Sequence, residues 1–161
     1  MGIYKLSLKD SLANFYLVAI HCGKEGFAMA FLLNKYVNLK LKRSKKDLEY
    51  TTDTSIIAFP HYFYEDIKQG IYYDLIANAR RYLKPTKDAS ESLFSADLSA
   101  LTTAYLIPEM KQVDYFLKIT SEMEYIEDSL LIANIQKIEQ VISAYNLDVN
   151  TLKSKNNLIF D

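Results

Sequence analysis

The sequence contains few of the residues on which disulfide frameworks, phosphate loops and metal sites depend. Its 161 residues include one cysteine, two histidines, four glycines and no tryptophan. A lone cysteine, Cys22, excludes an internal disulfide, and with it the small disulfide-stabilised secreted proteins. The glycines do not have the spacing of a nucleotide-binding loop. The turn GKEGFA at 23–28 therefore predicts the start of a helix, whose N-terminus could at most hold an anion.

Long apolar runs are also missing. No segment reaches the roughly 18 consecutive apolar residues of a membrane-spanning helix. The apolar run FYLVAI at 15–20 is far too short for the usual layout of a signal peptide. We therefore expect a cytoplasmic protein without a membrane segment.

Side chains for catalysis or metal binding are sparse. His21 and Cys22 are neighbours, so on a strand they would point to opposite faces and could not act as a pair. The other histidine, His61, lies far along the chain, and two histidines with one cysteine cannot complete a four-ligand zinc site without carboxylates. The sequence predicts no catalytic residue, no metal site and no cofactor, and hence a protein that is not an enzyme.

What the sequence does contain is typical of a globular domain. Half of the residues are hydrophobic and 24% are charged, and a chain of this length buries about 70% of its unfolded surface in a single domain, 1–161. Tyrosine and phenylalanine are abundant, which suits half-buried sheet faces and interfaces. Residues 1–90 carry 14 Lys and Arg against 9 Asp and Glu, whereas residues 91–161 carry 5 against 11. This asymmetry fits either a basic face for an anionic partner or two surfaces that neutralise each other.

Hydrophobic periodicity predicts alternating strands and helices. Aromatic and β-branched residues predict strands, and apolar residues three to four positions apart predict helices. The strands are expected at 15–20, 39–42, 55–65, 113–119 and 141–149, and the helices at 24–37 and 129–140.

Three further segments are less regular. The segment 71–83 reads as a strand or a helix, and the short turn before it favours a strand in a hairpin with 55–65, in which Pro60 marks an edge or a bulge. Residues 84–100 predict a flexible polar excursion. The tail at 152–160 could dock as a short final strand.

Two strand–helix–strand units around hairpin strands predict an α+β fold. We expect a mostly antiparallel sheet with two helices packed on one face, in a ferredoxin-like or ACT-like layout. The open face of the sheet would then be rich in tyrosine. Because sheets of this kind associate through an edge or an open face, a homodimer is expected.

The stretch IPEMKQVDYFLKI at 107–119 places Glu109 and Asp114 five positions apart beside a strand. Catalysis would require both carboxylates to converge on one cleft with separated pKa values. Nothing in the sequence provides such convergence, and an Asx residue at a strand start commonly accepts local hydrogen bonds. A structural role is favoured over a ligand or partner site, and catalysis is the least favoured.

The same stretch resembles a known pattern. Its residues Ile107, Pro108, Glu109, Val113, Asp114 and Tyr115 are similar to the motif that names the IPExxxVDY proteins, a small bacterial family. RSKKDL at 43–48 and LKSKNNLIF at 152–160 resemble other segments of that family. The family has no assigned activity, cofactor or catalytic residue, so the resemblance implies no chemistry.

Five cations within seven residues form the clearest candidate binding site: Lys40, Lys42, Arg43, Lys45 and Lys46. Contacts from these side chains to phosphates would give a steeply salt-dependent affinity, and the nearby tyrosines could stack on bases. Lysines on an edge strand also serve simply to prevent aggregation.

Two hypotheses of function follow. The leading one is a non-enzymatic cytoplasmic protein that acts through protein–protein contacts, as a homodimer or with an unidentified protein partner. The alternative is a nucleic-acid-binding or ribosome-associated protein, with RNA as a possible partner, that uses the strand at 40–46 together with Arg80 and Arg81.

Overall fold

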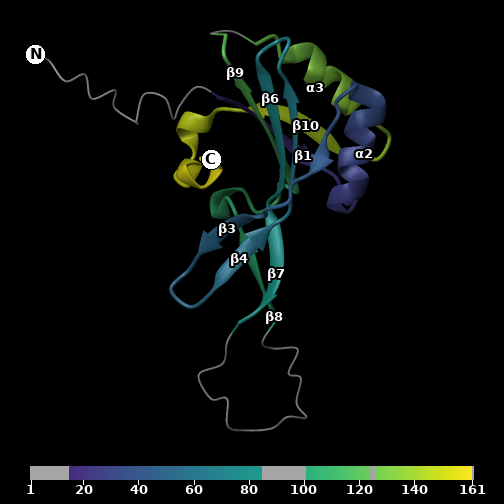
Figure 1. The fold of residues 1–161 in the computed structure, drawn as a ribbon. Helices are drawn as coiled ribbons and strands as arrows, with labels where there is room; N and C mark the ends of the chain where they lie inside the picture. Colours follow the sequence, from purple (N-terminus) through teal and green to yellow (C-terminus); the bar gives the residue numbers. More distant parts are fainter. Residues whose placement is uncertain (1–14, 85–100, 124–125, 161) are drawn as a thin grey trace, which may run out of the picture.

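The structure, a computed structural model, describes residues 15–84, 101–123 and 126–160. Within these ranges the chain forms one six-stranded sheet, two short two-stranded ribbons and two α-helices, and every strand pairing is antiparallel (Figure 1). The predicted α+β class with a mostly antiparallel sheet is confirmed. The excursion predicted at 84–100 lies, apart from Lys84, outside the described residues.

The six strands of the main sheet are not in chain order. From one edge to the other the order is β10-β1-β9-β6-β5-β2. The strands are, in that order, Ser143–Leu147, Phe15–His21, Tyr115–Ser121, Ile71–Ala77, His61–Asp66 and Lys42–Arg43. The strand predicted at 39–42 is therefore only two residues long and begins later. Leu39 and Leu41 are nevertheless buried, as their alternation with lysines predicted.

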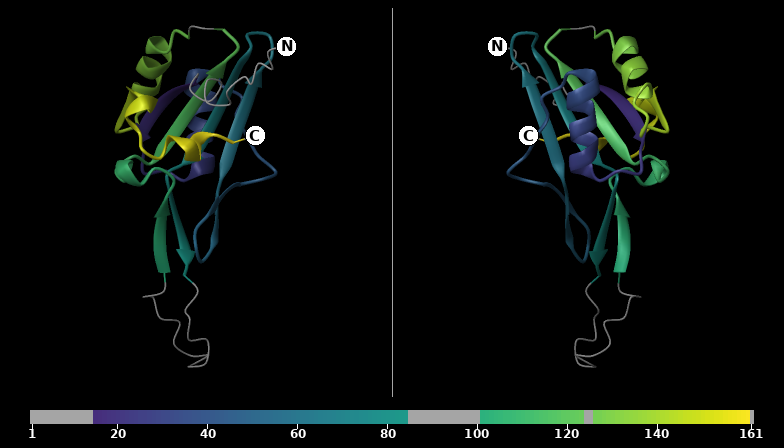
Figure 2. Two further views of the ribbon diagram at one scale, coloured as in Figure 1. Left: turned by 90° about the vertical axis from the view of Figure 1, so that its left-hand side faces the viewer. Right: turned by 90° about the vertical axis from the view of Figure 1, so that its right-hand side faces the viewer.

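Both helices cover the same face of the sheet (Figure 2, right). Helix α2 (Gly26–Val37) buries Met29 and Leu33 and is capped by the next residue, Asn38, which has a left-handed backbone conformation with φ 59°. Helix α3 (Ser129–Gln136) is shorter than the predicted 129–140. Together they enclose a core of strand residues that includes Val18, Leu75, Leu117 and Ile119.

The sheet divides at two points on neighbouring strands. Pro60 separates β5 from β4 (Ile56–Phe59), which pairs with β3 (Leu48–Thr51), and Asn78 separates β6 from β7 (Ala79–Leu83), which pairs with β8 (Leu101–Tyr105). The two ribbons β3–β4 and β7–β8 extend beyond the main sheet (Figure 1). The strand prediction for 71–83 and its hairpin with 55–65 are confirmed, because β5 pairs with β6 from His61↔Ile76 to Asp66↔Ile71.

The face opposite the helices is not an open tyrosine-rich surface, so that prediction is wrong. The C-terminal segment crosses this face (Figure 2, left), and it contains the 3₁₀ turns η3 (Val149–Thr151) and η4 (Lys155–Leu158) rather than the expected strand. A second core forms beneath it from Leu17, Phe116 and Leu158. Three tyrosines of β5 and β6, Tyr62, Tyr64 and Tyr73, instead pack against the helix-side core.

No helix among the described residues is both long and apolar enough to cross a membrane.

Candidate functional site

The segment 107–115, here called the IPE–VDY segment, is organised by one buried amide. The side chain of Asn78 donates to the backbone oxygens of Met110 (2.8 Å) and Val113 (3.0 Å) and accepts from the backbone N–H of Ile107 (2.8 Å). Its backbone N–H donates to the oxygen of Asp114 (2.9 Å). Asn78 is fully buried, so these bonds satisfy an amide that would otherwise be costly to desolvate.

Glu109 connects the IPE–VDY segment to the C-terminal segment. Its two carboxylate oxygens accept hydrogen bonds from the backbone N–H (2.7 Å) and the hydroxyl (2.9 Å) of Ser154. Partial desolvation raises the pKa of Glu109, but the hydrogen bonds from Ser154 outweigh it and hold the pKa below its ordinary value. The turn η2 (Pro108–Met110), with Pro108 at its start, aims the carboxylate in this direction.

Asp114 and Tyr115 hold the loop between β1 and α2. Asp114 Oδ2 accepts the backbone N–H of Cys22 at 2.9 Å, and the Tyr115 hydroxyl donates to the backbone oxygen of Lys24. Burial raises the pKa of Tyr115 far above its ordinary value, with further contributions from the Cys22 side chain and nearby acids. Glu109 and Asp114 thus bind two different segments of the chain, and the structure does not bring them together as a pair.

Four of the five predicted cations line one groove. Lys42, Arg43, Lys45 and Lys46 lie around a hollow of about 1170 Å³, which we call the basic groove; its other lining residues are Ser44, Asp47, Leu48, Glu49, Ala58, His61, Phe63 and Phe160. Lys40 lies elsewhere, in a separate hollow next to the C-terminal end of α2. Lys40 precedes β2, whose first residue is Lys42, and lies beside Val37, Asn38 and Leu39.

Not every cation in the basic groove is available to a ligand. Arg43 forms an ion pair with Asp47, and its guanidinium carbon lies 5.6 Å from the centroid of the Tyr62 ring. The Lys42 ammonium lies 4.7 Å from the centroid of the Phe63 ring. Among the described residues, neither Lys42 nor Lys45 nor Lys46 forms an ion pair. Within that part of the chain, three lysines therefore face the groove without a carboxylate partner.

A smaller hollow of about 310 Å³ adjoins the basic groove. We call it the aromatic hollow; it is lined by Ser44, His61, Phe63, Tyr64, Glu65, Tyr72, Tyr73, Asp74 and Phe160. His61, Phe63 and Phe160 border both hollows. The His61 ring lies 6.0 Å from that of Phe63 and 5.3 Å from that of Phe160, between centroids.

Beneath the aromatic hollow lies a largely buried cluster of ionisable side chains, His61, Asp74 and Lys118. His61 Nε2 lies 2.7 Å from Asp74 Oδ1, and the two side chains are 12% and 17% exposed. Asp74 is also directly opposite Lys118 across the β6–β9 pairing. Burial lowers the pKa of Lys118, while the charge of Asp74 partly raises it again. The Lys118 ammonium lies 4.1 Å from the Phe160 ring centroid, so this lysine contacts one of the rings that line the hollow.

Sequence reasoning did not identify Asn78, Asp74 or Lys118. Each interrupts an otherwise apolar strand, in IYYDLIANA and YFLKITS. A single polar residue at such a position is a recognisable signal, because a buried polar group needs a partner. The sequence could not reveal which residue pairs with which, since register across β6 and β9 joins segments about 40 residues apart.

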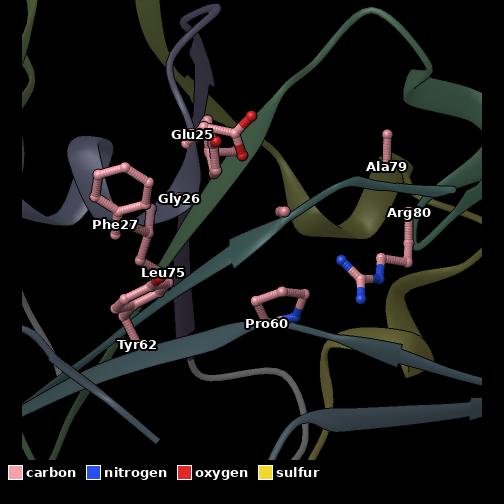
Figure 3. A pocket seen from close by; sticks show the side chains of 10 residues that line it. Glu25, Gly26, Phe27, Pro60, Tyr62, Leu75, Ala79 and Arg80 are labelled. Atoms are coloured by element: carbon pink, nitrogen blue, oxygen red, sulfur yellow. The ribbon is translucent and has the colours of Figure 1, made fainter.

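A third hollow of about 210 Å³ lies between the start of α2 and the point where the sheet divides (Figure 3). Tyr62, Leu75 and Phe27 form its wall, and Arg80 faces it from β7. A Cβ on Gly26 would lie 3.3 Å from the Tyr62 ring, so glycine permits this close approach. Arg80 thus lines this hollow and not the basic groove.

The described residues contain no cluster of three or more His, Cys, Asp or Glu side chains that could hold a metal ion. Cys22 is buried in the helix-side core, while His61 lies on the opposite face of the sheet beside Phe160. His21 instead lies 3.1 Å from the Tyr145 hydroxyl. These three side chains do not meet.

Comparison of the chain with protein-family models, curated proteins and solved structures finds no match.

Proposed function

We propose that this protein is a non-enzymatic binding protein whose basic groove takes a strand of nucleic acid. The observation that supports the proposal is the position of Lys42, Lys45 and Lys46 around one concave surface that also contains two phenylalanine rings. Cations that contact phosphates release counterions and supply affinity, and aromatic rings stack on bases regardless of sequence.

The charge of the groove favours a polyanion over a neutral ligand. Its three lysines lack a carboxylate partner among the described residues, and the acids that line it are Asp47, already paired with Arg43, and the exposed Glu49. If the lysines only prevented aggregation at the edge of the sheet, they would not need to surround a hollow. The short strand β2 fits that role, but Lys45 and Lys46 lie beyond it.

A salt titration with matched charge reversals tests the proposal. Binding of a labelled single strand, followed by fluorescence anisotropy, should weaken as salt rises. The slope of log K against log salt is negative, and in Lys45→Glu or Lys46→Glu it should become less steep by about 0.7 for each phosphate that the variant no longer neutralises. Lys40→Glu is the control, because it changes the net charge equally outside the groove. No binding at low salt, or equal weakening by Lys40→Glu, would reject the proposal.

A second candidate function is association through helix α2. Phe27 and Phe31 lie one turn apart and are 69% and 62% exposed, and α2 contains no acidic residue. A pair of exposed aromatic rings on a helix is the usual feature of a contact surface. A homodimer through this face would also satisfy the protein-contact hypothesis, and it leaves the basic groove free.

We further infer a ferredoxin-like layout for the central strands and membership of the IPExxxVDY family. The layout is supported by two connections that each skip one strand of the sheet. Along the chain, α2 follows β1 and precedes the β5–β6 hairpin, and in the sheet β9 lies between β1 and β6. Likewise α3 connects β9 to β10, and in the sheet β1 lies between these two strands. Family membership rests on the motif at 107–115, whose polar side chains each bind another segment of the chain.

A further inference from the structure

We propose that the aromatic hollow accepts one unpaired base of the strand bound in the basic groove. The inference rests on the proposed function and specifies its ligand: a single strand with accessible bases, rather than a duplex or an acidic protein. It concerns residues of the adjoining hollow, His61, Phe63, Asp74 and Phe160, of which Asp74 alone does not also line the basic groove.

The two hollows share a border. Phe63 and Phe160 line both of them, and the Lys42 ammonium lies over the Phe63 ring. A phosphate at Lys42 would therefore lie close to the ring on which the attached base could stack. In a single strand the phosphate and the base of one nucleotide are adjacent, so one nucleotide can occupy both hollows.

The charges of the two hollows differ in sign. The basic groove contains three lysines without a carboxylate partner in the described part of the chain, whereas the aromatic hollow is lined by two acids, Asp74 and Glu65, and one histidine. The acids repel a phosphate, and they do not exclude a neutral base. Phosphates are thereby directed to the groove and a base to the hollow.

The stacking surface is held in place before any ligand binds. Phe160 packs edge-on against His61 and over the Lys118 ammonium, and His61 is fixed by Asp74. A ring already held in one position loses little side-chain entropy on binding. An acidic peptide would bind the lysines through its carboxylates, but those carboxylates cannot stack on the aromatic rings.

A duplex is a poor ligand for the same reason. Its bases are paired and stacked inside the helix, so inserting one into the hollow requires unpairing and unstacking. The hollow of about 310 Å³ is lined by residues of β5, β6 and the C-terminal segment together with Ser44, and a base that stays stacked inside a duplex cannot enter it.

The test compares three polyanions of equal length on the wild-type protein: an unstructured DNA strand, the same strand annealed to its complement, and an abasic sugar–phosphate strand. At low salt the single strand should bind about tenfold more tightly than the abasic strand, the effect of one base–aromatic stack. Phe160→Ala should remove this difference and Phe160→Tyr should retain it. Lys45→Glu should weaken single and abasic strands by the same factor.

The outcomes separate the two proposals. If wild type binds the single and abasic strands equally, no base stacks on the phenylalanine rings and the inference is rejected, while the binding of phosphates by the lysines of the groove still stands. If polyglutamate competes as well as the single strand, the groove recognises acidic protein and both proposals are wrong. If no strand binds at low salt, the proposed function itself is rejected. The wild-type comparison decides these cases even where a Phe160 variant folds poorly.

Discussion

At the scale of single residues, the buried amide of Asn78 holds the IPE–VDY segment through its hydrogen bonds. Its side chain satisfies two backbone oxygens and one backbone N–H of that segment. Removing it would leave the Ile107 N–H and the Val113 oxygen without this partner, whereas the Met110 oxygen would keep the Val113 N–H. Each unsatisfied buried group costs about 1–3 kcal/mol.

Asn78→Ala should therefore lower the free energy of unfolding by about 3 kcal/mol, measured by urea denaturation. Asn78→Asp should also destabilise, because a carboxylate can accept from Ile107 but cannot donate to Met110 or Val113. Asn150→Ala is the control, since that asparagine is exposed. A loss of stability no larger than that of the control would show that the amide does not fix the segment.

Glu109 gives the protein a predictable acid dependence. Its pKa is lowered in the folded state, so the carboxylate stabilises the fold at any pH above the pKa it has when unfolded. That contribution is lost as pH falls from the ordinary pKa of a glutamate, about 4.3, through the lower folded-state pKa.

Glu109→Gln should lower the melting temperature at neutral pH and reduce its further fall in acid, as followed by circular dichroism over a pH series. Glu139→Gln, at an exposed position that follows α3, provides the comparison with equal charge change. Parallel pH profiles for wild type and Glu109→Gln would contradict the role assigned to the hydrogen bonds from Ser154.

At the scale of elements, the β5–β6 hairpin depends on the conformation of its turn. Gly70 precedes β6 with φ +62°, and a Cβ there would also lie 3.0 Å from Glu122 Oε2. A left-handed conformation costs an L-residue with a side chain roughly 1–2 kcal/mol. Gly23 offers a matched comparison, because a Cβ added to it would meet nothing within 4 Å.

Gly70→Ala should thus destabilise the protein by about 1 kcal/mol or more, while Gly23→Ala should leave stability nearly unchanged. Both variants can be compared by thermal or urea unfolding under identical conditions. Equal effects of the two substitutions would indicate that the turn can relax, so that the register of β5 and β6 is set by their side chains alone.

The accuracy of the sequence predictions varied with the kind of element. Strands with a clear aromatic and β-branched content, and the core of helix α2, were predicted close to their observed positions. The ends were not: α3 stops at Gln136, although Ile138 and Val141 remain buried. Apolar residues that follow the helix can keep the helical spacing because they are buried in the core. Spacing alone therefore predicts a helix that is too long.

At the scale of the whole molecule, the alternation of strands and helices in the sequence predicted the α+β class. It did not predict that a hydrophobic core forms on each face of the sheet. The sequence left open that the segment at 152–160 docks as a short final strand, whereas in the structure it crosses the face opposite the helices. Its position depends on the Glu109–Ser154 contact and on Asn157 donating to Leu106 at 2.8 Å. These contacts join residues about 50 positions apart, and local sequence patterns do not report them.

The candidate sites were predictable to a similar degree. The cluster of cations at 40–46 was evident from the sequence, but the exclusion of Lys40 depends on where β2 begins. The aromatic hollow could not be anticipated, because Phe160 and Asp74 meet His61 only through the fold.

The association state can be predicted from the distribution of exposed apolar side chains. Phe27 and Phe31 lie one turn apart on α2 and are both exposed. A second copy that meets α2 about a two-fold axis would bury these two rings on each protomer. Wild type should sediment as a dimer in analytical ultracentrifugation, and the double variant Phe27→Ser, Phe31→Ser as a folded monomer. Ile67→Ser, at an equally exposed site in the β5–β6 turn, should leave the dimer intact. A monomeric wild type, or a dimer that dissociates in Ile67→Ser, would refute the contact. Because α2 and the basic groove share no residue, the monomeric variant should still bind a nucleic-acid strand.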